Sequence, residues 1–387
     1  MSTKIAIIAH ALRSGGGLVQ TMNLLRALAD VAGDERFLLI YSQGYGYEQL
    51  KLPAGTDVYV YKGRHNPAER YWFELVTLPA VVKRYGADVV YSPGNTGLTN
   101  PPVPQALFIR NAYLFYGKEH YPDIHMYLRL RTASLKWELR KSLRGTKLVF
   151  CQTPVVKERF CRSYGYPPEQ VEILGFPPPA EIVNAAEREP PTVLAEKGDR
   201  FYVLVLASYM PHRNPSVLIP LCRKYAPQLR NARVRFITTV EPTDHPKAPA
   251  YLREVSALGF DDIITNVGRI DRDRLVDYLV NSDVFWSPTL LECLSTAHLE
   301  ALASGAAVMA PDLDFARYTC GEAAVYYNPW DVDSIFEKLM ILRNDEALRR
   351  NLAETAKVHL QDRQKFPQNW QEVAAVTLEK LRELATS

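Results

Sequence analysis

The apolar residues of the chain gather in short continuous runs that alternate with amphipathic stretches. Runs such as residues 4–9 and 201–207 lack the polar alternation of a half-exposed strand, which is typical of parallel strands covered on both faces. Between runs, apolar residues recur at helical spacing, as at positions 18, 22, 25 and 28 ahead of Gly33. Alternating buried strands and amphipathic helices predict a doubly wound α/β fold.

The pattern occurs twice. Strands are predicted at 4–10, 36–43, 57–63, 87–94, 105–111 and 146–153, and again at 201–208, 233–240, 262–268, 283–289, 306–312 and 324–329. In the second series, helices are predicted at 214–226, 251–259, 271–282, 295–305 and within 331–360. The segment between the series, 173–192, holds five of the 27 prolines and reads as a linker.

Two Rossmann-like domains follow, an N-terminal domain over 1–180 and a C-terminal domain over 193–365. Parallel sheets bind ligands at the carboxyl ends of their strands. The expected binding site is therefore a cleft across which the two sheets face each other.

Composition narrows the class of protein. With 47% apolar and 23% charged residues the chain is globular, and its net charge of +3 is too small to indicate a nucleic-acid partner. No apolar run reaches the roughly 18–20 residues of a membrane span, and residues 5–9 are too few for a signal peptide, so any membrane contact should be peripheral. The cysteines at 151, 161, 222, 293 and 320 lack metal or redox spacing, which indicates reduced thiols in the cytoplasm.

Two glutamates stand eight positions apart in "LLECLSTAHLEALASG". Ser295 is a good N-cap and Gly305 a good C-terminal residue for a helix, which places Glu292 in the preceding turn and Glu300 inside the helix. A helix N-terminus attracts phosphate, and Glu300 lies roughly 7 Å along the axis, beside where a ribose would lie. This arrangement suits a nucleotide sugar; the alternative is two solvated acids.

This segment resembles the Glu-x7-Glu motif of retaining GT-B glycosyltransferases of the GT4-type group. Other segments match in the same order: "SGGGLVQTMNLLRALA" the first glycine loop, "VEILGFPPPA" the interdomain stretch, "LASYMPHRNPSVLI" the phosphate loop, and "NVGRIDRDRLVDYLVNSDVFWSPT" the base-side region. The resemblance covers most of the chain and is strongest over 200–340. It implies a GT-B fold whose last helix, 366–387, packs back on the N-terminal domain.

The resemblance also implies roles for matching residues. Gly15 and Gly16 would let the donor phosphates approach the backbone, and Arg213 would neutralise the diphosphate. Glu292 would bind hydroxyls of the donor sugar and Glu300 the ribose. Ser295 and Thr296 would contact phosphate.

Departures from the family pattern qualify these roles. Ala207 and Ser208 stand where many members have Gly-Arg, so the second positive charge should be missing or come from His212 or Arg269. No histidine follows the strand at 105–111, where Asn111 is the candidate contact to the donor sugar. The candidate catalytic residues are therefore Glu292, Arg213 and Asn111.

Retaining transfer in this group is thought to need no protein nucleophile, because the leaving diphosphate helps to deprotonate the acceptor. The resemblance therefore implies a metal-independent enzyme without a cofactor, whose substrates are a UDP- or GDP-sugar and an acceptor hydroxyl. The nearest Asp-x-Asp sequence, 312–314, follows a late strand.

Residues 127–147 carry seven basic residues against one acid, with leucines at helical spacing. A basic amphipathic helix of this kind can lie on an anionic membrane; the alternative is a packed helix with a solvated basic face. The membrane interpretation predicts a cytoplasmic enzyme, peripheral at the inner face of the cell membrane, with a glycan or lipid-linked acceptor.

The sequence thus predicts a hexosyltransferase acting on a growing glycan with retention of configuration. Two alternatives stay open. One is a catalytically silent nucleotide-sugar-binding or scaffold protein, which Ser208 and the absent histidine favour. The other is a nucleotide-sugar epimerase on the same fold, which the lack of a clear acid–base pair disfavours.

Overall fold

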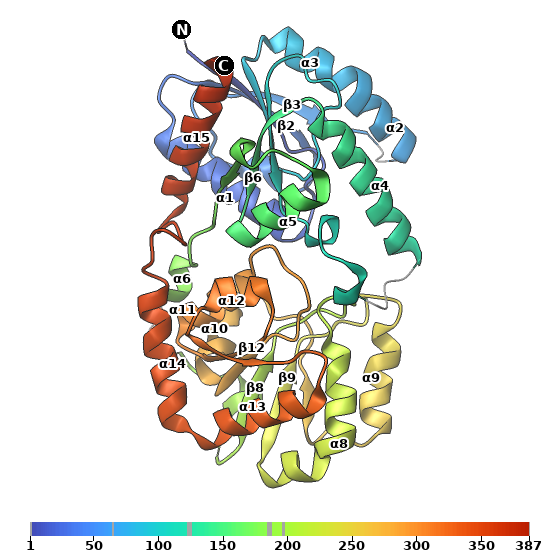
Figure 1. Cartoon of the computed structure of the whole chain (residues 1–387), viewed down its shortest axis with the longest axis vertical. Helices are drawn as coiled ribbons and strands as arrows, with labels where there is room; N and C mark the ends of the chain where they lie inside the picture. The colour runs from blue at the N-terminus through green and yellow to red at the C-terminus, as the bar shows by residue number, and fades with distance from the viewer. Residues whose placement is uncertain (1, 64–65, 122–125, 184–187, 196–197, 387) are drawn as a thin grey trace. The chain divides into compact units, whose positions relative to one another are not determined.

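A computed structural model describes residues 2–63, 66–121, 126–183, 188–195 and 198–386 (Figure 1). The chain forms two compact units. The first consists of Met1–Tyr116, His125–Pro177 and Pro367–Ser387, and the second of Gly117–Ile124 and Pro178–Phe366. The passage between the units at Pro177 falls inside the proline-rich segment 173–192, whereas the assignment of Gly117–Ile124 to the second unit has no counterpart in the predicted division.

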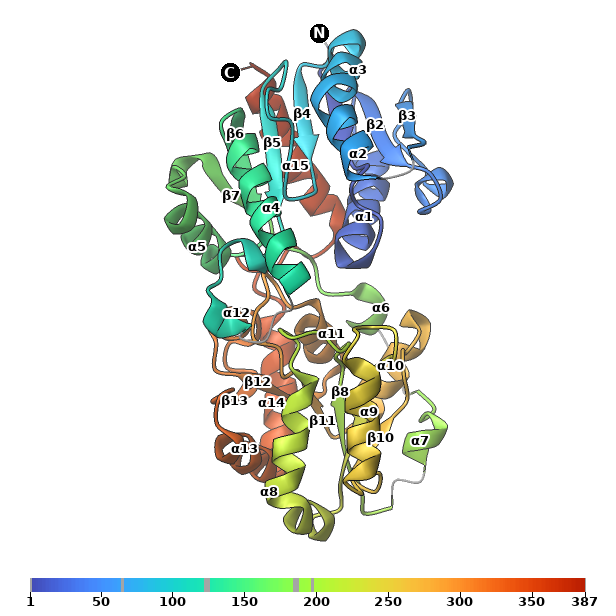
Figure 2. The same cartoon turned by 90° about the vertical axis from the view of Figure 1, so that its right-hand side faces the viewer.

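The first unit is built on seven parallel strands in the order β3-β2-β1-β4-β5-β6-β7, of which all but β1 are labelled in Figure 2. The strands are β1 (Lys4–Ile8), β2 (Arg36–Ser42), β3 (Asp57–Tyr61), β4 (Val89–Ser92), β5 (Gln105–Ile109), β6 (Thr146–Cys151) and β7 (Val171–Ile173). Its helices are α1 (Gly15–Val31), α2 (Pro67–Trp72), α3 (Leu78–Tyr85), α4 (Met126–Leu143), α5 (Pro154–Tyr164) and α15 (Trp370–Thr386). The sequence pattern missed β7 because three residues carry no readable period.

The second unit holds six parallel strands in the order β10-β9-β8-β11-β12-β13. They are β8 (Phe201–Val205), β9 (Val234–Thr238), β10 (Ile264–Asn266), β11 (Val284–Trp286), β12 (Ala307–Pro311) and β13 (Ala324–Tyr327). Its helices are α6 (Ala180–Val183), α7 (Thr192–Ala195), α8 (Leu218–Asn231), α9 (Ala248–Ala257), α10 (Arg272–Asn281), α11 (Thr296–Ser304), α12 (Asp314–Cys320), α13 (Val332–Asn344) and α14 (Glu346–His359).

Both sheets are buried on both faces, as the continuous apolar runs predicted. All five side chains of β5, β8 and β12 are buried. In both units the strand order reverses direction beside the first strand, β1 or β8. At such a switch point the loops diverge and leave room for a ligand.

Two helices differ from the predicted pattern. The glycines expected in a loop before the first helix form its first turn, since α1 begins at Gly15 and ends at Val31, ahead of Gly33. The helical stretch predicted within 331–360 is two helices, because Asp345 caps α14 by accepting a hydrogen bond from Leu348 N–H at 2.7 Å.

Helix α15 packs along α1 in the first unit (Figure 1). Its apolar stripe of Val373, Ala374, Leu378 and Leu381 is buried. At its start, the Trp370 and Phe176 rings lie 5.0 Å apart. Near its end, Arg382 pairs with the buried carboxylate of Glu35. The last residues of the chain therefore complete the core that the first residues begin.

Candidate functional site

The start of α11 lies at the carboxyl end of β11, as predicted. Ser295 is the N-cap, and its Oγ accepts a hydrogen bond from His298 N–H at 3.3 Å. Thr296 is the first helical residue and is exposed, and Gly305 ends the helix with a φ of 76°. Glu292 lies in the preceding turn and Glu300 one and a half turns into the helix, so the predicted placement of the two acids is confirmed.

Glu300 is buried, with only 9% of its surface exposed. Burial raises the pKa of its carboxyl to about 7; Arg272 works against this rise, whereas Glu181 adds to it. Arg272 Nη1 lies 4.0 Å from Glu300 Oε1, and its Nη2 donates to Glu181 Oε1 at 2.9 Å. A carboxylate with so little access to water is stabilised in its charged form by hydrogen-bond donors. Ligand hydroxyls can supply these donors.

Glu292 faces the loop that follows β8. Arg213 Nη2 lies 3.9 Å from Glu292 Oε1, and the guanidinium remains partly exposed. Two hydrogen bonds to one carbonyl oxygen join the two loops. Leu290 N–H donates to His212 O at 2.6 Å, and the Thr289 side chain donates to the same oxygen through Oγ1 at 3.2 Å. Burial raises the pKa of Glu292, an effect that Arg213 opposes.

Three further predicted residues lie in neighbouring loops of this unit. Ser208 follows β8, and its carbonyl accepts from Met210 N–H at 2.8 Å. Burial, helped by Arg213, lowers the pKa of His212 to about 3. His212 is therefore neutral at physiological pH in this structure, which disfavours it as the source of the second positive charge. Arg269, after β10, is exposed, and its backbone N–H donates to Glu241 Oε1 at 2.6 Å.

The remaining predicted residues belong to the first unit. Gly15 has a φ of 70°, which favours glycine, and a Cβ there would meet no described atom within 4 Å. Gly16 is nearly as open. Asn111 follows β5, and its Oδ1 accepts from Tyr113 N–H at 3.1 Å, capping a 3₁₀ turn. These residues share the carboxyl edge of the first sheet, where Arg110 Nη2 donates to Thr21 Oγ1 of α1 at 3.0 Å.

Sequence reasoning missed a polar cluster at this same edge. His10 Nε2 lies 2.8 Å from Glu74 Oε1, and Arg70 Nε donates to the same oxygen at 2.7 Å. Burial acts to raise the pKa of Glu74, but His10 and Arg70 together hold it below its usual range. His10 is 5% exposed and its Nδ1 has no partner among the described residues. The sequence carries little sign of this cluster, because His10 and Glu74 lie 64 positions apart.

His298 was also missed. It lies fully buried in α11 between the Phe285 and Phe315 rings, and burial lowers its pKa to about 4. Neither ring nitrogen has a partner among the described residues. A neutral histidine in this position packs as an aromatic residue behind the candidate site.

The described residues offer neither a metal cluster nor a membrane span. Within the described ranges, no group of three or more His, Cys, Asp or Glu side chains could hold a metal ion. None of the helices in that part of the chain is long and apolar enough to cross a membrane.

Comparison with known proteins gives a family match for part of the chain and a fold for the whole of it. Residues 187–359 match the model of the family described as glycosyl transferases group 1. A comparison with curated protein sequences found no match. Among solved structures, the sucrose-phosphate synthase of Thermosynechococcus elongatus has a TM-score of 0.72 at 16% identity and covers 100% of both chains.

Two other solved structures are similar. WaaG, a glycosyltransferase involved in lipopolysaccharide biosynthesis, has a TM-score of 0.69 at 16% identity and covers 96% of this chain and 99% of its own. HepE from Anabaena, in complex with UDP-glucose, has a TM-score of 0.70 at 14% identity and covers 98% and 99%. The predicted GT-B architecture of two Rossmann-like units is confirmed.

Proposed function

We propose that the protein is a retaining hexosyltransferase, and the match of residues 187–359 to the glycosyl transferases group 1 model is the premise of this proposal. It moves a hexose from a UDP- or GDP-sugar to a hydroxyl of a growing glycan. The acceptor is lipid-linked or part of a cell-surface polysaccharide. The enzyme works in the cytoplasm, without a metal or cofactor.

The buried carboxyl of Glu300 is the observation that carries this proposal. It lies just inside the helix whose first N–H groups, at Thr296 and Ala297, can take a phosphate. A ribose beside α11 would donate its two hydroxyls to Glu300, while the phosphates meet the helix N-terminus and Arg213. The hexose would then reach Glu292, whose Oε1 lies 3.9 Å from Arg213 Nη2.

The chemistry asked of the protein is positioning and charge stabilisation. As the donor bond breaks, negative charge grows on the diphosphate, and Arg213 is the described cation of this loop nearest to Glu292. The neutral ring of His212 adds no charge to this loop, so Arg213 is proposed to carry the charge stabilisation there. Gly15, Gly16 and Asn111, on the first unit, are proposed as further contacts to the donor.

The comparisons support the substrate class in outline. HepE was solved with UDP-glucose, and WaaG takes part in lipopolysaccharide biosynthesis. We infer a nucleotide-sugar donor and a surface glycan acceptor by analogy with these proteins, which share the fold at low sequence identity.

Membrane contact through α4 is part of the proposal. Only Thr132, Leu139 and Ser142 of this helix are buried. Its outward side exposes Met126, Tyr127, Leu130 and Trp137, each by half or more, beside exposed arginines. Apolar side chains next to basic ones can enter a headgroup layer while the arginines meet anionic lipid. A merely solvated basic face would not need these four residues.

A screen of nucleotide sugars by thermal shift, followed by turnover with the hit, tests the function. We expect one nucleoside diphosphate sugar to stabilise the protein, and its sugar to appear on an acceptor or, slowly, on water. Binding without transfer or hydrolysis would favour the silent binding protein, which Ser208 in place of a second arginine also favours. Conversion of the sugar to its epimer would replace the proposal with an isomerase.

A further inference from the structure

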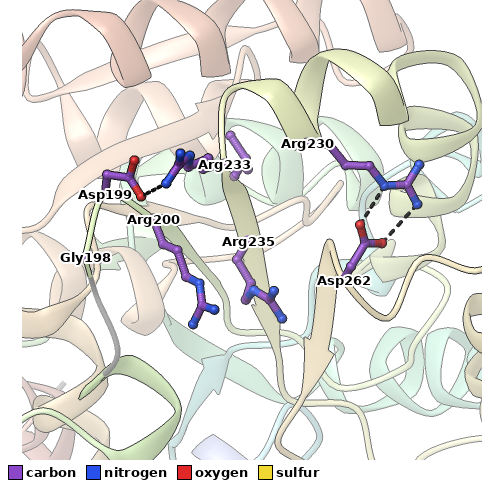
Figure 3. A pocket seen from close by; sticks show the side chains of 8 residues that line it. Gly198, Asp199, Arg200, Arg230, Arg233, Arg235 and Asp262 are labelled. Carbon is purple, nitrogen blue, oxygen red and sulfur yellow. Dashed lines mark hydrogen bonds and ion pairs between the residues drawn. The ribbon is translucent and has the colours of Figure 1, made fainter.

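A polar pocket lies in the second unit, at the edge of the sheet where its strands begin. It has a volume of about 470 Å³ and opens beside the first residues of β8 and β9 (Figure 3). It is lined by Gly198, Asp199, Arg200, Arg230, Arg233, Val234, Arg235 and Asp262. The volume is within the roughly 300–1,000 Å³ of small-molecule sites.

The lining is strongly basic. Four guanidinium groups face two carboxylates, which leaves a net charge of +2. Asp199 pairs with Arg233, and Asp262 accepts two hydrogen bonds from Arg230, at 2.6 and 3.0 Å. Both carboxylates are thus already engaged. In Figure 3, Arg200 and Arg235 lie between these two ion pairs and point the same way.

The backbone gathers these arginines from separate elements. Arg200 immediately precedes β8, and Arg235 is the second residue of β9. The two strands pair in parallel with Phe201 opposite Val234. Arg235 is partly buried, and its Nη1 donates to Thr265 Oγ1 of β10 at 3.2 Å, which fixes the guanidinium at the pocket.

Arg233 lines the pocket from an unfavourable backbone conformation. Its φ of 52° places it in the left-handed region, where glycine or asparagine costs less. An arginine in this turn accepts a strained backbone while bringing another cation to the pocket. Like charges held together in this way repel one another, and a bound anion relieves that repulsion.

The pocket is separate from the candidate donor site. Residues 201–205 of β8 run from this edge to the loop that carries Arg213, a span of roughly 17 Å at 3.3 Å per residue. A donor diphosphate bound at the start of α11 cannot also occupy the pocket. The anion that fits here is therefore a second ligand.

We propose that this pocket binds a phosphate group, carried by a small phosphorylated molecule or by a phospholipid headgroup. Guanidinium forks match phosphate oxygens in pairs, and the net charge of +2 matches a phosphate dianion. The site does not depend on the proposed transferase activity. It gives the second unit an anion-binding function away from the donor.

Pyrophosphate titrations by calorimetry at constant ionic strength test the site. The wild type should bind pyrophosphate at two sites, the pocket and the donor loop. Arg200→Gln/Arg235→Gln should remove one and Arg213→Gln the other. Arg223→Gln is the matched control, because Arg223 lies in the same unit, outside the pocket, in an exposed pair with Glu254.

The pocket affinity should fall at least about tenfold in the double variant, as expected when charge-assisted hydrogen bonds are lost. Arg235→Lys keeps the charge but loses the fork, and offers a milder change if the double variant folds poorly. An isotherm of the double variant that superimposes on wild type and control would overturn the proposal. The loss of pyrophosphate binding at the donor loop in Arg213→Gln tests the proposed function. It says nothing against the pocket.

Vesicles distinguish the two sources of the phosphate group. The wild type, the double variant and the control are sedimented with phosphatidylcholine vesicles that contain phosphatidic acid. Weaker sedimentation of the double variant alone assigns the pocket to a lipid headgroup. Equal sedimentation of all three, together with lost pyrophosphate binding, assigns it to a free phosphorylated molecule. No effect in either assay refutes the site.

Discussion

Replacing Glu300 by glutamine should make the ligand-free protein more stable and the donor complex weaker. The carboxyl has a pKa of about 7 in the folded protein against an ordinary value of 4.5, because burial disfavours its charge. The folded state therefore binds the proton more tightly than the unfolded state. Stability contributed by this proton is complete below about pH 4.5 and is lost as the pH rises through 7.

The size of the effect follows from the same values. A pKa of about 7 against 4.5 corresponds to a cost of at most about 3 kcal/mol at pH 8. Glutamine keeps the shape without the charge, so Glu300→Gln should recover part of this cost. At about 2–4 °C per kcal/mol, Tm at pH 8 should rise by up to about 10 °C. At pH 4, where both side chains are neutral, the two proteins should melt together.

Donor binding should move in the opposite direction. Loss of the charged acceptor for two ribose hydroxyls should weaken the nucleoside diphosphate by about 1–3 kcal/mol. In the wild type the affinity for the nucleotide should rise as the pH passes through 7, because the ionised Glu300 carboxylate accepts hydrogen bonds from both ribose hydroxyls. The variant should show no such rise. Calorimetry with the nucleotide found in the screen measures both. A lower Tm of the variant at pH 8, or an unchanged Kd, would refute the reasoning.

Three further predictions concern metal, stereochemistry and membrane. Because Arg213 and the start of α11 should carry the diphosphate charge, EDTA should leave turnover intact, and loss of turnover restored only by Mg²⁺ or Mn²⁺ would contradict this phosphate site. An α-linked donor should give an α-linked product by the anomeric coupling in proton NMR; a β-linked product would require a general base on the acceptor side and would overturn the retaining assignment. Trp137→Ala should reduce sedimentation with anionic vesicles, whereas Trp330→Ala, an equally exposed tryptophan of the second unit, should not; equal behaviour of the two would exclude docking through α4.

Local signals in the sequence were enough to predict α11 and every strand described except β7. Ser295 and Gly305 carry capping chemistry within a few residues of the helix they bound, so the helix and the two acids could be placed from sequence. The short α12, by contrast, has its N-cap at Leu313, which makes no side-chain cap, and it followed a predicted strand too closely to be separated.

Properties set by distant contacts could not be predicted. The neutrality of His212 follows from burial, which no neighbouring residue reveals. The cluster of His10 with Arg70 and Glu74 joins the end of β1 to a helix more than fifty residues later. Glycines at 15–17 read as a loop because glycine is a poor helix former, yet the first turn of α1 tolerates them.

The packing of α15 on α1 has a consequence for synthesis on the ribosome. The first unit needs Pro367–Ser387, which follow the whole of Pro178–Phe366, roughly 190 residues. At about 5–20 residues per second, the nascent first unit waits roughly 10–40 s for its last helix. During that time the surface of α1 that α15 later covers is open to other chains. Chaperones that shield apolar surface should therefore matter more to this protein's yield than its final stability would indicate.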